Sequence, residues 1–272
     1  MRVVLCIEYN GAGFCGFQSQ KGARTVQQCL EFALSEVADH QVAIRCAGRT
    51  DTGVHASYQV VHFDTTSERG MRAWVLGVNS NLPSDVCVVW AEEVDSSFDA
   101  RFSAIDRTYY YFILNSSARS ALLHRKITWE CRKLDTSVMR KASEVLIGEH
   151  DFSTFRASGC QAQNPVRVVQ EIVISETGSV IFFKVRANAF LQHMVRNVVG
   201  SLLEVGSGRR PENWIKQILE QKKRSLGGPT AAPDGLYLTG VRYPSCYRLP
   251  DPSQSVARIP WVGLAFGIEK RW

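Results

Sequence analysis

The side chains best suited to chemistry are concentrated between Gly48 and Ala56. Within this segment Asp51 supplies a carboxylate, Arg49 a guanidinium and His55 an imidazole. Groups of these types act as nucleophiles, as bases and as binding groups for anions. The two glycines of the segment permit a tight loop, because glycine adopts backbone conformations that a Cβ forbids. The pattern therefore predicts a loop that directs Asp51 outward.

Two other interpretations of the tripeptide Asp51-Thr52-Gly53 have to be weighed. Asp-Thr-Gly is a good turn sequence, because Asp bonds its own backbone and Gly takes a positive φ. The same tripeptide occurs in aspartic proteases, where two carboxylates share one proton. This chain has no second Asp-Thr-Gly or Asp-Ser-Gly, which argues against a protease. A structural turn and a catalytic loop both stay open at this point.

The elements around the loop follow from residue pattern. Runs rich in β-branched and aromatic residues flank it at 42–47 and 58–63, and predict a hairpin. Further strands are predicted at 2–9, 86–94, 107–114, 168–175, 180–187 and 234–241. Helices are predicted at 26–37, 73–79, 134–148, 188–205 and 211–223.

Some details of these elements are more specific. Thr25 is placed to cap the helix predicted at 26–37. Asp135 or Thr136 is placed to cap the helix predicted at 134–148. The nearly unbroken apolar character of 86–94 predicts a strand buried on both faces. Gly200 predicts a close approach of another segment to its helix. The two halves share a similar order of elements, which predicts an α+β protein with antiparallel strands in one sheet and helices on one side.

Composition sets broader limits. The 272 residues suggest one large or two modest domains, and a formal charge of +6 favours a polyanionic partner. The apolar run near the N-terminus is too short for a signal peptide or a membrane span. Eight scattered cysteines without a Cys-x-x-Cys pair argue against a zinc site and favour free thiols in the cytoplasm.

The segment from Gly48 to Ala56 closely resembles the active-site motif of the TruA family of tRNA pseudouridine synthases. Similar family segments are found at 14–18, 98–104, 107–114, 151–156, 159–165, 190–200 and 234–241. Three positions depart from the family pattern: Phe17 replaces Trp, Thr154 replaces the common Ser, and Asp234 replaces Glu. The likeness covers about residues 3 to 243, and only residues 245–272 have no predicted role.

The resemblance implies roles for individual residues. Asp51 is the catalytic residue, by attack at C1′, by attack at C6 or by proton abstraction. Arg196 is presented to Asp51 and keeps it ionised, because an opposite charge favours the charged carboxylate. Tyr109 lines the uridine pocket, and Leu236 packs near the uracil. Arg49 is assigned to fill the space left by the flipped base, while His55 is interpreted as loop architecture bonded to backbone.

Other residues are implied to contact RNA. They are Phe98 and Arg101 in a connecting segment and Gln161 in a polar loop. An equally weighted alternative is that the connecting segment only joins two domains and that its phenylalanines belong to the core. A distributed basic surface is predicted from Arg101, Arg107, Arg119, Arg125, Lys126, Arg132 and Lys133.

The family further implies two similar units, 1–104 and 105–244, that share a continuous sheet with an active cleft on its open face. It implies isomerisation of uridines 38, 39 and 40 in the tRNA anticodon arm, without cofactor or metal, by a homodimer that does not bind membranes. The main alternative is a non-catalytic tRNA-binding module or RNA chaperone, which has no need of Asp51. A protein-interaction scaffold is a third, and predicts no salt-dependent RNA affinity.

Overall fold

The computed structural model describes residues 1–259 and Val262, and these form two compact units. Unit 1 comprises residues 1–105 together with the described residues from Tyr237 onward, and unit 2 comprises Asp106–Leu236. The expected division instead assigned residues through 244 to the second unit. The difference arises because Tyr237 and Leu238 pair with His55 and Ala56, which belong to unit 1.

Unit 1 is built on a sheet of mostly antiparallel strands. The strands are β1 (Arg2–Tyr9), β2 (Arg45–Cys46), β3 (His55–Asp64), β4 (Val86–Val94) and most of β10 (Leu236–Arg242). Their order is β4-β1-β3-β10, with β2 added to β3. The bounds predicted for β1 and β4 are confirmed. The prediction that β4 is buried on both faces is wrong, because β4 lies at the edge of the sheet and leaves several side chains exposed.

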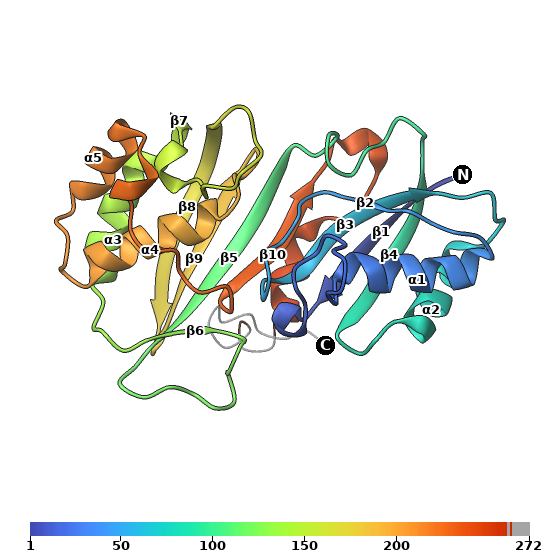
Figure 1. Cartoon of the computed structure of the whole chain (residues 1–272), viewed down its shortest axis with the longest axis horizontal. Helices are drawn as coiled ribbons and strands as arrows, with labels where there is room; N and C mark the ends of the chain where they lie inside the picture. The colour runs from blue at the N-terminus through green and yellow to red at the C-terminus, as the bar shows by residue number, and fades with distance from the viewer. Residues whose placement is uncertain (260–261, 263–272) are drawn as a thin grey trace. The chain divides into compact units, whose positions relative to one another are not determined.

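Two helices of unit 1 lie over one face of these strands (Figure 1). Helix α1 (Val26–Ala38) is capped by Thr25, as predicted. The side chain of Thr25 accepts a hydrogen bond from the backbone N–H of Gln28. Helix α2 (Met71–Asn81) packs against α1 and β4. Its Trp74 is fully buried and meets Phe63 of β3 edge-to-face, with ring centroids 5.1 Å apart.

The segment without a predicted role packs on the opposite face of the unit 1 strands. Tyr58 of β3 donates a hydrogen bond to the carbonyl of Pro250 at 2.6 Å. Because side chains alternate along a strand, Tyr58 and the helix-facing Phe63 point to opposite faces. The described part of this segment includes a 3-10 helix at Pro252–Arg258. Residues 260, 261 and 263–272 of the predicted tail lie outside the described part of the chain.

Unit 2 has its own sheet, covered by helices. Its strands are β5 (Asp106–Asn115), β6 (Thr128–Glu130), β7 (Gly148–Asp151), β8 (Val166–Thr177) and β9 (Val180–Ala187). The order β5-β9-β8-β7 is antiparallel throughout, and β6 pairs parallel to β5. Figure 1 shows α3 (Thr136–Ser143), α4 (Met194–Gly206) and α5 (Trp214–Gln221) gathered over β8 and β9. The predicted α+β class with mostly antiparallel strands is confirmed.

Three helices in unit 2 differ from the prediction in their bounds. The helix expected at 211–223 spans Trp214–Gln221, because the residues from Pro211 form a turn in which the Trp214 N–H donates to Pro211 O at 3.0 Å. The helix expected from Asn188 begins at Met194, because Asn188 continues the pairing with β8: its N–H donates to Val168 O at 3.1 Å, and its side chain accepts from the Val168 N–H at 3.0 Å. The helix expected to reach Gly148 ends at Ser143, and Gly148, with φ of +107°, starts β7. Asp135 caps α3 as predicted.

No helix in the described residues combines the length and the apolar character that crossing a membrane would require.

Candidate active site

Asp51 lies in the loop that precedes β3 in unit 1. The backbone N–H of Val54 donates to the carbonyl of Asp51 at 3.1 Å, and Gly53 has a φ of +80°. The turn interpretation of this tripeptide is therefore correct for the backbone. The side chain of Asp51 is half-buried, so a turn and a partly accessible carboxylate coexist in one segment.

A second loop, which follows β1, packs against the Asp51 loop along its length. The N–H of Phe17 donates to Thr50 O at 3.0 Å, and the N–H of Gly53 donates to Phe14 O at 3.4 Å. Gly16, with φ of +87°, lies so close that a Cβ would be 2.9 Å from Thr50 O. These contacts fix the backbone on both sides of Asp51.

Thr50, the residue directly before Asp51, is held through its side chain as well. Its hydroxyl shares a hydrogen bond of 2.8 Å with the hydroxyl of Tyr9 at the end of β1. Thr50 is 7% exposed and Tyr9 4%. A hydrogen bond between two buried hydroxyls satisfies both groups and gives the loop a defined position relative to the sheet.

His55 anchors the other end of the loop. Its Nδ1 accepts a hydrogen bond from the backbone N–H of Gly11 at 3.0 Å, which requires that this nitrogen carry no proton. Its ring stacks on Tyr237, with centroids 4.5 Å apart and an angle of 17° between planes. A Cβ on Gly11 would lie 1.9 Å from Val54 O, so only glycine fits there. The interpretation of His55 as loop architecture bonded to backbone is confirmed.

The start of the loop is tied to the same sheet. The side-chain amide of Gln59, which is fully buried in β3, donates to the carbonyl of Gly48 at 2.6 Å. Arg49, between this anchor and Thr50, is exposed. The loop thus combines a fixed backbone with an exposed guanidinium and a half-buried carboxylate two positions apart.

Four of the predicted site residues lie in unit 2, and three of them, Tyr109, Arg196 and Leu236, are implied to lie at the uridine or beside Asp51. Tyr109 on β5 is 7% exposed, and its ring meets Phe190 edge-to-face at 5.0 Å between centroids. Arg196, in the first turn of α4, is half-buried, and its Nε donates to Ala231 O at 2.8 Å. Leu236 is 5% exposed.

Gly200 on the same helix confirms the predicted close approach. A Cβ at this position would lie 1.8 Å from the carbonyl oxygen of Pro229. The segment that carries Pro229 also bonds to the helix through the Ala231 N–H, which donates to Arg196 O at 3.1 Å. Arg196 is therefore hydrogen-bonded to Ala231 through both its backbone carbonyl and its side chain.

The segment predicted to contact RNA needs one correction. Phe98 is fully buried, and its ring packs against His62, Tyr243 and Tyr247 at centroid distances of 6.0, 5.0 and 4.9 Å. Its side chain is thus a core anchor and is inaccessible to RNA. The exposed ring of the segment is Phe102, which is 77% accessible and which the sequence reasoning missed.

The side chain of Asp99 closes a turn between the buried Phe98 and the exposed Phe102. One of its carboxylate oxygens accepts the N–H groups of Arg101 at 2.8 Å and Phe102 at 2.9 Å, which closes a turn. Burial acts to raise the pKa of Asp99, but these two backbone donors, together with the nearby His62 and Arg45, outweigh it and hold the pKa below its usual value. The Arg101 guanidinium lies 5.3 Å from the Phe102 ring centroid, and both side chains are exposed. The Asp two residues before Arg101 was the available signal for this turn.

Gln161 lies in an exposed loop of unit 2, as expected. Among the described residues, no group of three or more His, Cys, Asp or Glu side chains is placed to hold a metal ion. The chemistry that the Asp51 loop offers is nucleophilic or proton-transfer chemistry by its carboxylate.

Comparison with known proteins identifies the family to which the chain belongs. A family model described as tRNA pseudouridine synthase matches residues 5–103 and 142–244. The matched residues include the Asp51 loop, the segment around Phe98 and the start of α4.

Curated relatives match over almost the whole chain. A tRNA pseudouridine synthase A from Nitrosococcus oceani is 50% identical over 256 residues, which covers 94% of this chain and 99% of the relative. A protein of the same name from Methylobacillus flagellatus is 50% identical over 265 residues, covering 97% and 100%. One from Alcanivorax borkumensis is 49% identical over 251 residues, covering 92% and 94%. The chain therefore belongs to the TruA family of tRNA pseudouridine synthases.

Proposed function

We propose that this protein converts uridine to pseudouridine in the anticodon arm of tRNA, at positions 38, 39 and 40. The observation that carries the proposal is the Asp51 loop: a half-buried carboxylate on a backbone fixed from both sides, in a member of this family. A fixed carboxylate is what a reaction on a flipped nucleotide needs, because misplacement of a catalytic group costs rate steeply.

The proposed reaction is an isomerisation with no net gain or loss of atoms. The bond from N1 of uracil to C1′ breaks, the base turns, and a new bond forms from C5 to C1′. The proton on C5 is lost and N1 gains one. Asp51 starts the sequence by assisting cleavage of the N1–C1′ bond. No electrons are transferred to or from an outside group, so the reaction itself calls for no redox cofactor.

The roles of Arg49 and Arg196 are carried over from the family resemblance. Arg49 is proposed to occupy the space that the base leaves, and its exposure is compatible with that role. Arg196 is proposed to act together with Asp51 in the reaction. If so, Arg196→Met should lower the rate of pseudouridine formation more than it weakens tRNA binding, and an unchanged rate would refute the assignment.

Tyr109 and Leu236 are proposed to contact the target base. Both are almost fully buried, at 7% and 5% exposure, which suits the walls of a pocket that excludes water. Phe98 is not proposed as an RNA contact, because its ring is buried. Arg101 and Gln161 are retained, since both side chains are exposed.

The test uses tRNA that carries tritium at C5 of uridine, because loss of the C5 proton releases tritium to water. The purified protein, with no added cofactor, is expected to release tritium. Asp51→Asn should release none and still bind tRNA, because the carboxamide has nearly the same shape but no charge. Asp39→Asn is the matched control, since Asp39 is exposed at the end of α1 and its left-handed backbone, with φ of 56°, suits Asn.

Tritium release and tRNA binding together distinguish an isomerase from a non-catalytic tRNA-binding module. Salt-dependent tRNA binding by a wild-type protein that releases no tritium would identify a binding module and refute the isomerase. Mapping of pseudouridine along the product tRNA tests the three positions. The homodimer implied by the family is tested by the molar mass of the protein in sedimentation.

A further inference from the structure

The loop that joins β5 to β6, residues 116–127, is exposed and carries charge of one sign. Arg119, Arg125 and Lys126 are all exposed, and His124 is exposed beside them. Neither Asp nor Glu occurs between Asp106 and Glu130. Exposed cations without interspersed carboxylates create a positive potential that attracts a polyanion. In Figure 1 this loop extends past the ends of the strands of its own unit.

The backbone of the loop is ordered by its own turns. The N–H of Lys126 donates to Leu123 O at 3.0 Å, and the N–H of Leu123 donates to the Ser120 hydroxyl at 3.2 Å. Arg125 has a φ of 57°, in the left-handed region that non-glycine residues rarely occupy. The cationic side chains are therefore displayed on a folded backbone, which reduces the entropy lost on binding.

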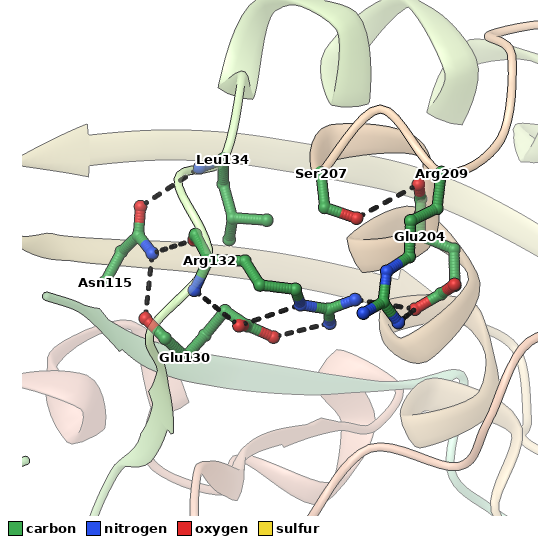
Figure 2. A network of polar contacts seen from close by, with 7 residues as sticks. All are labelled: Asn115, Glu130, Arg132, Leu134, Glu204, Ser207 and Arg209. Carbon is green, nitrogen blue, oxygen red and sulfur yellow. Dashed lines mark hydrogen bonds and ion pairs between the residues drawn. The ribbon is translucent and has the colours of Figure 1, made fainter. Parts of the chain in front are cut away.

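The two ends of the loop are joined by a polar network (Figure 2). The Asn115 amide donates to the carbonyls of Glu130 at 2.9 Å and Arg132 at 2.6 Å. The indole N–H of Trp129 donates to Ser116 O at 2.9 Å, which ties the strand after the loop to the residue that starts it. Because both ends are fixed to the sheet, the loop has a defined base.

The acidic groups of this base are engaged by their own arginines. Arg132 bonds the Glu130 carboxylate at 2.6 Å and the Glu204 carboxylate at 2.9 Å, and Arg209 lies 3.7 Å from Glu204. Burial acts to raise the pKa of Glu130, but the hydrogen bonds from Arg132 outweigh it and lower the pKa. The carboxylates of Glu130 and Glu204 are thus paired with the guanidinium groups of Arg132 and Arg209.

We propose that residues 116–127 form an arm that binds the phosphate backbone of RNA, and that the polar base holds the arm in its binding conformation. The identity of the partner rests on the proposed function. Guanidinium and ammonium groups bind phosphate oxygens directly, whereas such contacts carry little sequence information. The arm therefore contributes affinity for tRNA and leaves the choice of uridine to the catalytic pocket.

The first test removes the charges. The triple variant R119Q/R125Q/K126Q is compared with R69Q/R72Q/K216Q, which removes the same number of exposed cations elsewhere. Binding of tRNA is measured from low to moderate salt. Each phosphate that the protein neutralises adds about 0.7 to 0.9 to the slope of log K against log salt, so the slope of the arm variant should be smaller by about 2 to 3. Its Kd should rise about tenfold or more at ~0.1 M salt, and the control should match wild type.

The second test loosens the base and keeps every charge. Trp129→Phe removes the indole donor to Ser116, and because Trp129 is 44% exposed the variant should fold. We expect a Kd for tRNA about two- to fivefold higher with an unchanged salt slope, since the same phosphates are neutralised while the arm is less ordered.

The inference is overturned if the arm variant binds tRNA with the same Kd and salt slope as the control variant. The part of the inference that assigns a role to the polar base is overturned if Trp129→Phe binds tRNA with the same Kd as wild type. These failures are distinct from failure of the proposed function: a wild-type protein that binds RNA through the arm but releases no tritium would refute the isomerase and support the arm.

Discussion

The hydroxyl groups of Tyr9 and Thr50 meet at 2.8 Å in the interior of unit 1. Tyr9 ends β1, and Thr50 immediately precedes the proposed catalytic Asp51, so this bond links the sheet to the reactive carboxylate. It is part of a set of contacts that includes Gly11 with His55 and Phe17 with Thr50. The backbone around Asp51 is thus positioned by residues from the end of β1 and from the second loop.

Removal of one hydroxyl should weaken catalysis with little effect on binding. Tyr9→Phe deletes a hydrogen bond worth about 1 kcal/mol, and we expect kcat to fall about three- to tenfold because the Asp51 loop loses a restraint. The Kd for tRNA should stay near wild type, because neither hydroxyl is exposed. Tritium release and filter binding measure the two quantities.

The same bond allows an internal control. Thr50→Val should reproduce the decrease in kcat seen in Tyr9→Phe, Thr50→Ser should retain wild-type kcat, and the double variant Tyr9→Phe/Thr50→Val should be no worse than either single variant. A strictly additive double variant would show that the two side chains act independently of their mutual hydrogen bond.

Glycine should be required at position 11. A Cβ there would lie 1.9 Å from Val54 O, so Gly11→Ala must displace the second loop or the Asp51 loop, at a cost of about 1–3 kcal/mol in unfolding free energy. Gly159→Ala is the control, because its Cβ would have a single neighbour, at 4.0 Å. Denaturant unfolding of both variants checks this, and equal stability would mean that the loops relax freely.

The two phenylalanines of the connecting segment should behave oppositely. Phe98→Ala empties a fully buried site and should cost about 3–5 kcal/mol of unfolding free energy. Phe102→Ala should leave stability unchanged, because the ring is 77% exposed. If the ring stacks on a base, the same variant should weaken tRNA binding by about 1–3 kcal/mol. A lower unfolding free energy for Phe102→Ala would contradict the exposure of this ring.

His62 should make stability depend on pH in the mildly acidic range. Burial lowers the pKa of His62 below its ordinary value of 6.5, and the nearby Asp99 opposes this only in part. The Nδ1 of His62 accepts the N–H of Ala100 at 3.0 Å, which requires an unprotonated nitrogen. Since the folded pKa is the lower one, the stabilisation is present above the unfolded pKa and is lost as the pH falls from about 6.5 toward the folded value.

The measurement for His62 is a comparison of unfolding free energies at several pH values. His62→Gln retains a hydrogen-bond acceptor but does not titrate, so its stability should change less than that of wild type as the pH is lowered through the mildly acidic range. Every other histidine is common to both proteins and cancels in the difference. Identical pH profiles would show that His62 is not the responsible group.

Local signals in the sequence were sufficient for the fold class and for many elements. The bounds of β1 and β4, the cap at Thr25 and the start of α1 follow from residue pattern, periodicity and capping chemistry, which depend on residues a few positions apart. The motif around Asp51 likewise identified the candidate catalytic residue.

The sequence failed where distant segments compete with local pattern. The helix expected from Asn188 starts six residues later because Asn188 bonds to Val168 across the sheet. The apolar run of β4 is only half-buried because the order of strands leaves it at an edge.

Residue types and their order thus predicted that a carboxylate, an arginine and two glycines share a loop in an α+β protein, and the motif around Asp51 resembled the TruA family, to which the comparisons assign the chain. Only the tertiary structure decided that Tyr9, 41 residues from Thr50, restrains that loop, and that Phe98 is buried while Phe102 is displayed. The physical reason is range: alternation and capping act between neighbours, whereas burial and long-range hydrogen bonds depend on which segments the folded chain brings together.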